Sequence, residues 1–65
     1  MCHQLIDKVE GIYTIGELRA KFSDVWIYEI IFYSKRSNFI YYKKRLYEKE
    51  RAEKYFAQKR KEYLG

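Results

Sequence analysis

The sequence contains no proline, three glycines, one cysteine and one histidine. A single cysteine excludes an intrachain disulfide, and Cys2 with its neighbour His3 cannot supply the four ligands of a tetrahedral zinc site. No apolar run approaches the roughly 20 residues of a membrane span, and the N-terminus lacks a basic segment followed by an apolar one. These absences predict a cytoplasmic protein with no metal or other cofactor and no membrane span.

Catalytic groups are equally scarce. Cys2 and His3 are adjacent at a terminus, where a nucleophile and a base rarely hold the required geometry, and no third group is evident to orient them. The sequence has no glycine-rich loop to cradle a phosphate, and Glu48 and Glu50 would not face each other on a helix. A chain of 65 residues also has little room for a catalytic pocket. We therefore expect a protein that is not an enzyme.

The chain is short for a stable single domain. Its 65 residues would bury only about 60% of their unfolded surface, and such a core rarely contributes more than about 3–5 kcal/mol without further support. Because neither a disulfide nor a metal can supply that support, we expect a protein partner or a second copy to do so, and a homo-oligomer is predicted.

The most apolar segment is VWIYEIIFY, at residues 25–33. At 100° per residue, a helix over about 24–36 places Trp26, Ile30 and Tyr33 on one face. The alternative is a β-hairpin with SKRSN as its loop, because the segment is rich in β-branched residues. That loop lacks the glycine usual in hairpins, so the helix is favoured.

A helix that is apolar all round is normally buried on all sides. The other segments offer few large apolar side chains to cover this one, so part of its surface is expected to meet another chain. The predicted protein interface consists of Trp26, Ile30, Ile31, Tyr33 and Phe39.

A second helix, over about 15–22, is predicted by the sequence YTIGEL. Thr14 and Glu17 have the spacing of a capping box, in which each side chain bonds the backbone amide of the other. Tyr13 and Leu18 occupy the two positions of a hydrophobic staple.

The C-terminal part, from about 39 to 63, is predicted to form a long helix because strong helix formers predominate there. Its apolar stripe of Ala52, Phe56 and Tyr63 is narrow. The helix is therefore expected to project from the apolar body.

The net charge of +5 lies entirely in this C-terminal part. Residues 1–42 hold five basic and five acidic side chains, whereas residues 43–62 hold nine basic and four acidic ones. The chain is thus predicted to be one domain, with a neutral apolar body over 1–42 and a basic C-terminal helix over 43–65. The basic surface consists of Lys43, Lys44, Arg45, Lys49, Arg51, Lys54, Lys59, Arg60 and Lys61.

A basic helix has three interpretations. It can contact the phosphates of a nucleic acid through residues 43–61, dock on an acidic protein surface, or keep an apolar protein dispersed. Interleaved tyrosines could stack on single-stranded bases, but tyrosine is also enriched at protein interfaces. The four glutamates weaken the nucleic-acid interpretation, because they would repel phosphates.

Two resemblances bear on function. YTIGEL is similar to the opening of MerR-type and excisionase-type DNA-binding domains, which implies a helix-turn-helix regulator; however, VWIYEIIFY in place of the recognition helix has almost no polar group to read bases. The layout of residues 14–63 resembles small assembly proteins of tailed phages. That resemblance implies a viral or mobile-element protein that binds a virion component or its own copies, in the host cytoplasm or in the virion.

Together these observations predict an all-α fold, with a short capped helix, an apolar helix and a long basic C-terminal helix arranged as a helical hairpin or small bundle that forms an oligomer. Its function is expected to be binding without catalysis, through the apolar body and the basic helix. The alternative is a DNA-binding regulator of the helix-turn-helix type.

Overall fold

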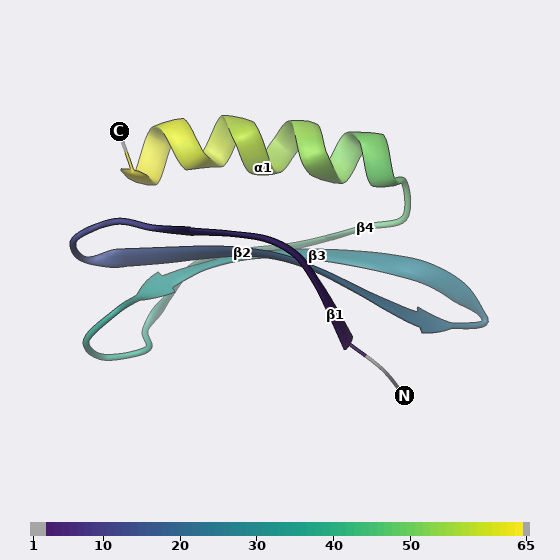
Figure 1. The fold of residues 1–65 in the computed structure, drawn as a ribbon, viewed down its shortest axis with the longest axis horizontal. Helices are drawn as coiled ribbons and strands as arrows, with labels where there is room; N and C mark the ends of the chain where they lie inside the picture. The colour runs from purple at the N-terminus through teal and green to yellow at the C-terminus, as the bar shows by residue number, and fades with distance from the viewer. Residues whose placement is uncertain (1–2, 65) are drawn as a thin grey trace.

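The computed structural model describes residues 3–64 and shows an antiparallel sheet followed by one helix (Figure 1). The elements are β1 (His3–Glu10), β2 (Thr14–Ser23), β3 (Val25–Ser34), β4 (Ile40–Leu46) and α1 (Lys49–Leu64). The four strands pair in chain order, β1-β2-β3-β4, so the sheet is a meander. α1 lies along one side of the sheet, and within the described part of the chain nothing covers the other side (Figure 1).

The prediction of an all-α fold is wrong. The helix expected over 15–22 is most of β2, the helix expected over 24–36 is β3, and the hairpin alternative is the one that the structure shows. Strand alternation is hard to see in β3 because both of its sides carry apolar side chains. Ile30 and Phe32 are fully buried beneath α1, and Ile31 between them is nearly as buried on the uncovered side.

The turns of both long hairpins form without glycine. Asp24, between β2 and β3, has φ 67°, and Asn38, between β3 and β4, has φ 61°. Aspartate and asparagine enter this left-handed region several-fold more often than other non-glycine residues. The hydroxyl oxygen of Ser34 also accepts the backbone N–H groups of Arg36 and Ser37, at 3.3 Å each. The missing glycine was therefore not evidence against a hairpin.

The expected capping box does not cap a helix. Thr14 begins β2, where it lies opposite Ser34, and Glu17 lies opposite Ile31. β2 pairs with β1 on one edge and with β3 on the other, so the sheet satisfies its backbone groups on both sides. Long-range pairing of this kind outweighs a local capping signal that contributes about 1 kcal/mol.

The C-terminal helix is present, but it begins at Lys49 rather than near residue 39, because residues 40–46 form β4. The boundary expected after residue 42 thus falls inside a strand. α1 also does not project from the body. Its buried residues Ala52 and Phe56 join the core cluster on the sheet, and the Phe56 ring stacks on Phe32 with centroids 5.6 Å apart.

The core depends on a glycine facing an aromatic ring. Gly16 lies opposite Phe32 in the β2–β3 register, and the Phe32 ring lies across the position that a side chain at residue 16 would occupy. On its other side, Phe32 meets the rings of Phe56 and Tyr63 from α1. The ring is fully buried between the sheet and the helix.

Gly16→Ala is expected to destabilise the protein by about 1–3 kcal/mol, because a methyl group there overpacks a filled core. Its Cβ would meet two ring carbons of Phe32 at 2.7 and 2.9 Å. Gly11→Ala is the matched control, since its Cβ would meet mainly the flexible end of the Leu64 side chain. Urea unfolding followed by circular dichroism measures both. Equal stabilities for the two variants would contradict this account of the core.

Candidate functional site

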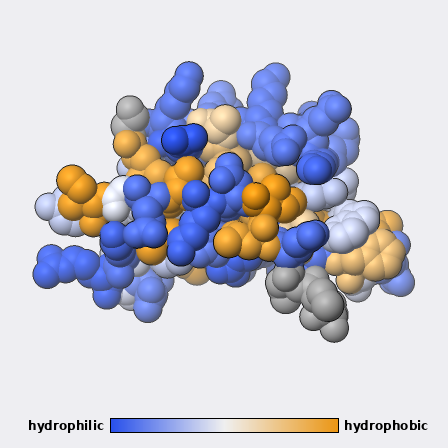
Figure 2. All heavy atoms as spheres, in the orientation of Figure 1, coloured by the Kyte–Doolittle hydropathy of each residue, from blue (hydrophilic) through white to orange (hydrophobic). Residues whose placement is uncertain are grey.

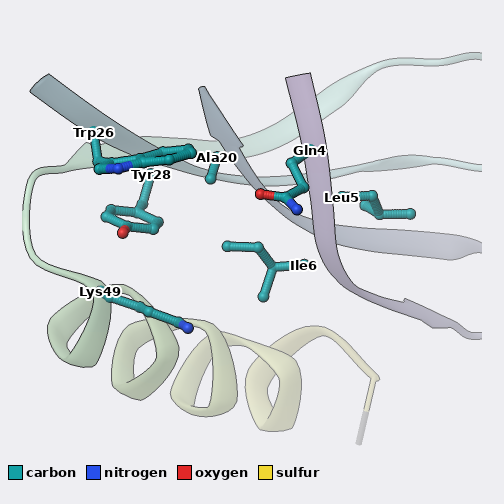
Figure 3. A pocket seen from close by; sticks show the side chains of 7 residues that line it. All are labelled: Gln4, Leu5, Ile6, Ala20, Trp26, Tyr28 and Lys49. Atoms are coloured by element: carbon teal, nitrogen blue, oxygen red, sulfur yellow. The ribbon is translucent and has the colours of Figure 1, made fainter. Parts of the chain in front are cut away.

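A groove of about 450 Å³ lies between the first turn of α1 and the adjoining ends of β1, β2 and β3. Figure 3 shows the Trp26 and Tyr28 rings on the sheet side, Ile6 and Gln4 on the β1 side, and Lys49 reaching across from α1. The lining residues are Gln4, Leu5, Ile6, Ala20, Trp26, Tyr28 and Lys49.

Local sequence features keep this end of the sheet open. β1 has a register shift between Leu5 and Asp7, a bulge that bends the strand beside the groove. On the neighbouring strand, Ala20 contributes only a methyl group where Leu18, two residues earlier, fills the core. The space between α1 and the sheet is therefore filled at Leu18 and hollow at Ala20.

Large apolar side chains surround the groove and are exposed. Trp26 is 46% exposed and Phe22 is 52% exposed, and their rings lie 5.3 Å apart on the same side of the sheet. Leu5, which lines the groove from β1, is more than half exposed as well. Figure 2 shows hydrophobic side chains at the surface at this end, whereas the outer side of α1 is mostly hydrophilic. Exposed apolar groups gathered in one place mark interaction sites more often than scattered ones do.

The polar groups on the groove lining include the Gln4 amide and the Lys49 ammonium. Neither makes a side-chain hydrogen bond or ion pair within residues 3–64. A hollow that combines aromatic and aliphatic side chains with free polar groups on its wall can hold an apolar group and orient it. The lining contains no carboxylate, imidazole or thiol that could pair with Lys49 in acid–base chemistry.

The uncovered side of the sheet has a different character. Its central carboxylates are Glu17 and Glu29, and each is flanked by basic side chains. Arg19 Nε donates to Glu17 Oε1 at 2.7 Å, while Arg45 Nε and Lys43 Nζ lie 3.3 and 3.8 Å from Glu29 Oε2. The charges on this side are thus largely paired among themselves.

Glu17 is the more buried of these two carboxylates. Tyr33 Oη donates a hydrogen bond to Glu17 Oε2 at 2.8 Å. Burial alone would raise the pKa of Glu17, but the hydrogen bonds from Tyr33 and Arg19 and the charge of Arg19 outweigh it and hold the pKa below its usual 4.5. The same hydrogen bond raises the pKa of Tyr33 above its usual 10.0.

The residues of the predicted interface do not form one surface. Trp26 lines the groove. Ile30 is fully buried beneath α1 and so is not available to a partner, whereas Ile31 and Tyr33 belong to the uncovered side. Phe39 is exposed in the β3–β4 loop, at the end of β3 away from Trp26.

The predicted basic surface is also divided. Lys43 and Arg45 point to the uncovered side and pair with Glu29. Lys44, between them, points to the helix side, where its Nζ lies 4.9 Å from the centre of the Tyr55 ring.

The other six basic residues lie on α1. Lys49 enters the groove, and Arg51 lies 4.0 Å from Glu48. Lys59 pairs with Glu62 at 3.2 Å and lies over the Tyr42 ring. Lys54, Arg60 and Lys61 are exposed.

Several residues were not identified from the sequence as site residues, namely Gln4, Leu5, Ile6, Ala20 and Tyr28 in the groove lining and Phe22 beside Trp26. The signal for part of the set was present in FSDVW, where Ser-Asp, a turn-favouring pair, separates two large apolar residues. A tight turn at Asp24 places Phe22 and Trp26 opposite each other. The contribution of β1 depends on its bulge, and no residue type in the sequence indicates that bulge.

No three His, Cys, Asp or Glu side chains within the described part of the chain lie together as a metal site would require. Cys2 and the side chain of His3 lie outside that part. Across residues 3–64, no helix is both long enough and apolar enough to cross a membrane.

Comparison with known proteins shows no relationship: the chain matches no family model, no curated protein and no solved structure. The residues that resembled the start of a helix-turn-helix domain belong to β2, and those in place of its recognition helix form β3.

The pKa of Glu17 predicts an acid-dependent stability. Its folded pKa lies below the usual 4.5, so the carboxylate stabilises the fold above that pH, and this contribution is lost as the pH falls through the folded pKa. Glu17→Gln should therefore flatten the fall in unfolding free energy below about pH 4.5.

Tyr33→Phe should flatten it less, because Arg19 still holds the carboxylate. Tyr28→Phe, which leaves Glu17 untouched, is the control. Urea unfolding at a series of pH values measures all three variants, and wild-type pH dependence in Glu17→Gln would contradict the assignment.

Proposed function

We propose that the protein is a non-enzymatic binding protein that docks on a protein partner through the groove beside α1. The observation that carries this proposal is the exposed ring pair of Phe22 and Trp26 at the edge of a 450 Å³ hollow that is lined by both apolar and polar side chains. Tryptophan and tyrosine are the side chains that most often dominate the energy of protein interfaces, and they do so in pockets from which water can be excluded.

The free energy available from covering the exposed part of the two rings supports docking. An aromatic side chain buries about 150–250 Å² when it is fully covered. Trp26 and Phe22 are each about half exposed, so covering the remainder would contribute about 2–3 kcal/mol per ring at about 25 cal/mol per Å². Two such rings and the neighbouring Leu5 are enough to anchor a small interface.

A nucleic-acid partner is supported less well. The nine predicted basic residues lie on both sides of the sheet and on α1, and four of them, Lys43, Arg45, Arg51 and Lys59, have carboxylate partners. Phosphate binding is strongest where unpaired basic residues gather on one surface. Nucleic-acid binding through residues 43–61 therefore stays a prediction and is the second candidate.

The resemblance to tailed-phage assembly proteins also stays a prediction. It rested on a layout of three helices, and residues 14–46 form strands instead. The proposal of docking therefore rests on the groove and not on that resemblance.

A selection of random peptides on the immobilised protein tests the groove without a known partner. We expect selected peptides to carry large apolar side chains. Their affinity, measured by fluorescence anisotropy of the labelled peptide, should fall at least tenfold in Trp26→Ala, the loss of about 1.4 kcal/mol or more. Phe39→Ala is the matched control, because it removes an aromatic ring that is even more exposed, at the opposite end of β3.

Equal losses in both variants, or selected peptides that bind Trp26→Ala as tightly as the wild type, would contradict docking in this groove. A selection dominated by acidic peptides without apolar side chains would favour the basic residues instead. Circular dichroism of each variant confirms that the fold is retained.

A further inference from the structure

We infer that the partner is a second copy of this chain, and that two copies interlock by placing the β2–β3 turn of each in the groove of the other. This inference rests on the proposed function, since it names the occupant of the same groove. Three observations carry it: the shape of this end of the molecule, the unpaired charges at the turn and in the groove, and the exposed apolar side chains between them.

The shape is that of a step. In Figure 1 the β2–β3 turn extends beyond the first turn of α1, so the sheet forms a floor and the start of the helix forms a wall. The floor carries Phe22, Trp26 and Tyr28 on the side that faces α1. Lys49, the first residue of α1, stands on the wall.

Two such steps fit together floor to floor. Sheets that pack face to face are separated by about 10 Å, and a helix with its side chains is about 10–12 Å thick. A second sheet laid on the floor therefore lies at the level of α1, and its turn points at the first turn of the helix. Phe22 and Trp26 of the two copies then cover one another.

The charges agree with this arrangement. Asp24 is exposed at the outermost point of the turn and has no ion-pair or hydrogen-bond partner within residues 3–64. In the interlocked pair it meets Lys49 of the other copy. It also meets the N-terminus of α1, where a carboxylate is favourable. The neighbouring Glu48 already faces Arg51.

A two-fold axis repeats each contact, so the pair contains two contacts between Asp24 and Lys49. An unrelated segment in the groove would cover Trp26 but would leave the turn exposed. A second copy covers both, because the turn and the groove belong to the same surface.

Charge reversal tests the inference. Wild type should sediment as a dimer of about twice 8.1 kDa at tens of micromolar. Asp24→Lys places lysine opposite lysine in both contacts, and Lys49→Asp places aspartate opposite aspartate. Each variant alone should dimerise at least tenfold more weakly. An equimolar mixture should recover the wild-type dimer, because both contacts of the heterodimer then join lysine to aspartate.

Asp24→Asn separates the loss of the charge contact from a folding defect. Lysine is strained at φ 67°, whereas asparagine is tolerated there. Asp24→Asn should weaken the dimer several-fold while keeping the wild-type circular dichroism. The control Asp7→Asn changes an exposed carboxylate on β1 away from the turn and should leave the dimer unchanged.

Three results would overturn the inference: a wild type that stays monomeric at several hundred micromolar, a folded mixture that does not recover the dimer, or an Asp24→Asn dimer as tight as wild type. A monomeric wild type whose groove still binds selected peptides through Trp26 would remove the second copy as partner and leave the proposed docking function in place. A monomeric wild type whose groove binds no selected peptide would remove the proposed docking function as well.

Discussion

The packing of Phe32 between Gly16 and α1 is the constraint on which the rest of the structure depends. The ring lies directly against β2 because residue 16 has no side chain. Its other face is then free to meet Phe56 and Tyr63, which fixes the distance and direction of the helix over the sheet. A glycine in β2 thus determines the position of α1, which begins more than thirty residues later in the chain.

The same constraint explains why the groove is at the opposite end of the helix. Aromatic rings fill the space beneath the second half of α1, whereas Ala20 and the bulged β1 leave space beneath its first turn. The helix is anchored at one end and overlies a hollow at the other. Core packing and a binding surface therefore arise from one alternation of large and small side chains along β2 and β3.

The sequence was sufficient for part of this description. A C-terminal helix with Ala52 and Phe56 on its apolar stripe was predictable from helix propensity and spacing, as was the exposure of most of its charges. The sheet was not, because β3 is apolar on both sides and because Asp24 and Asn38 take the backbone conformation that glycine usually supplies.

The site was predictable only in part for a related reason. Trp26 was identified as an interface residue, but its neighbours in space come from β1, β2 and α1. The helical interpretation grouped Trp26 and Ile30 with Tyr33, whereas in the strand Trp26 and Ile30 face α1 and Tyr33 lies on the uncovered side. Grouping residues by the wrong period therefore joined side chains that lie on opposite sides of the sheet.

The meander has a consequence for how the chain reaches its native state. Every strand pairs with the strand that follows it, and no loop between paired strands is longer than the five residues 35–39. Contacts that are close in sequence cost little chain entropy to form, and proteins dominated by them fold fast for their size. Hairpins form in about 1–10 μs, so the sheet can grow one strand at a time from the β2–β3 hairpin. Because Ala52 and Phe56 of α1 pack against side chains from several strands, we expect the helix to dock after the sheet has paired.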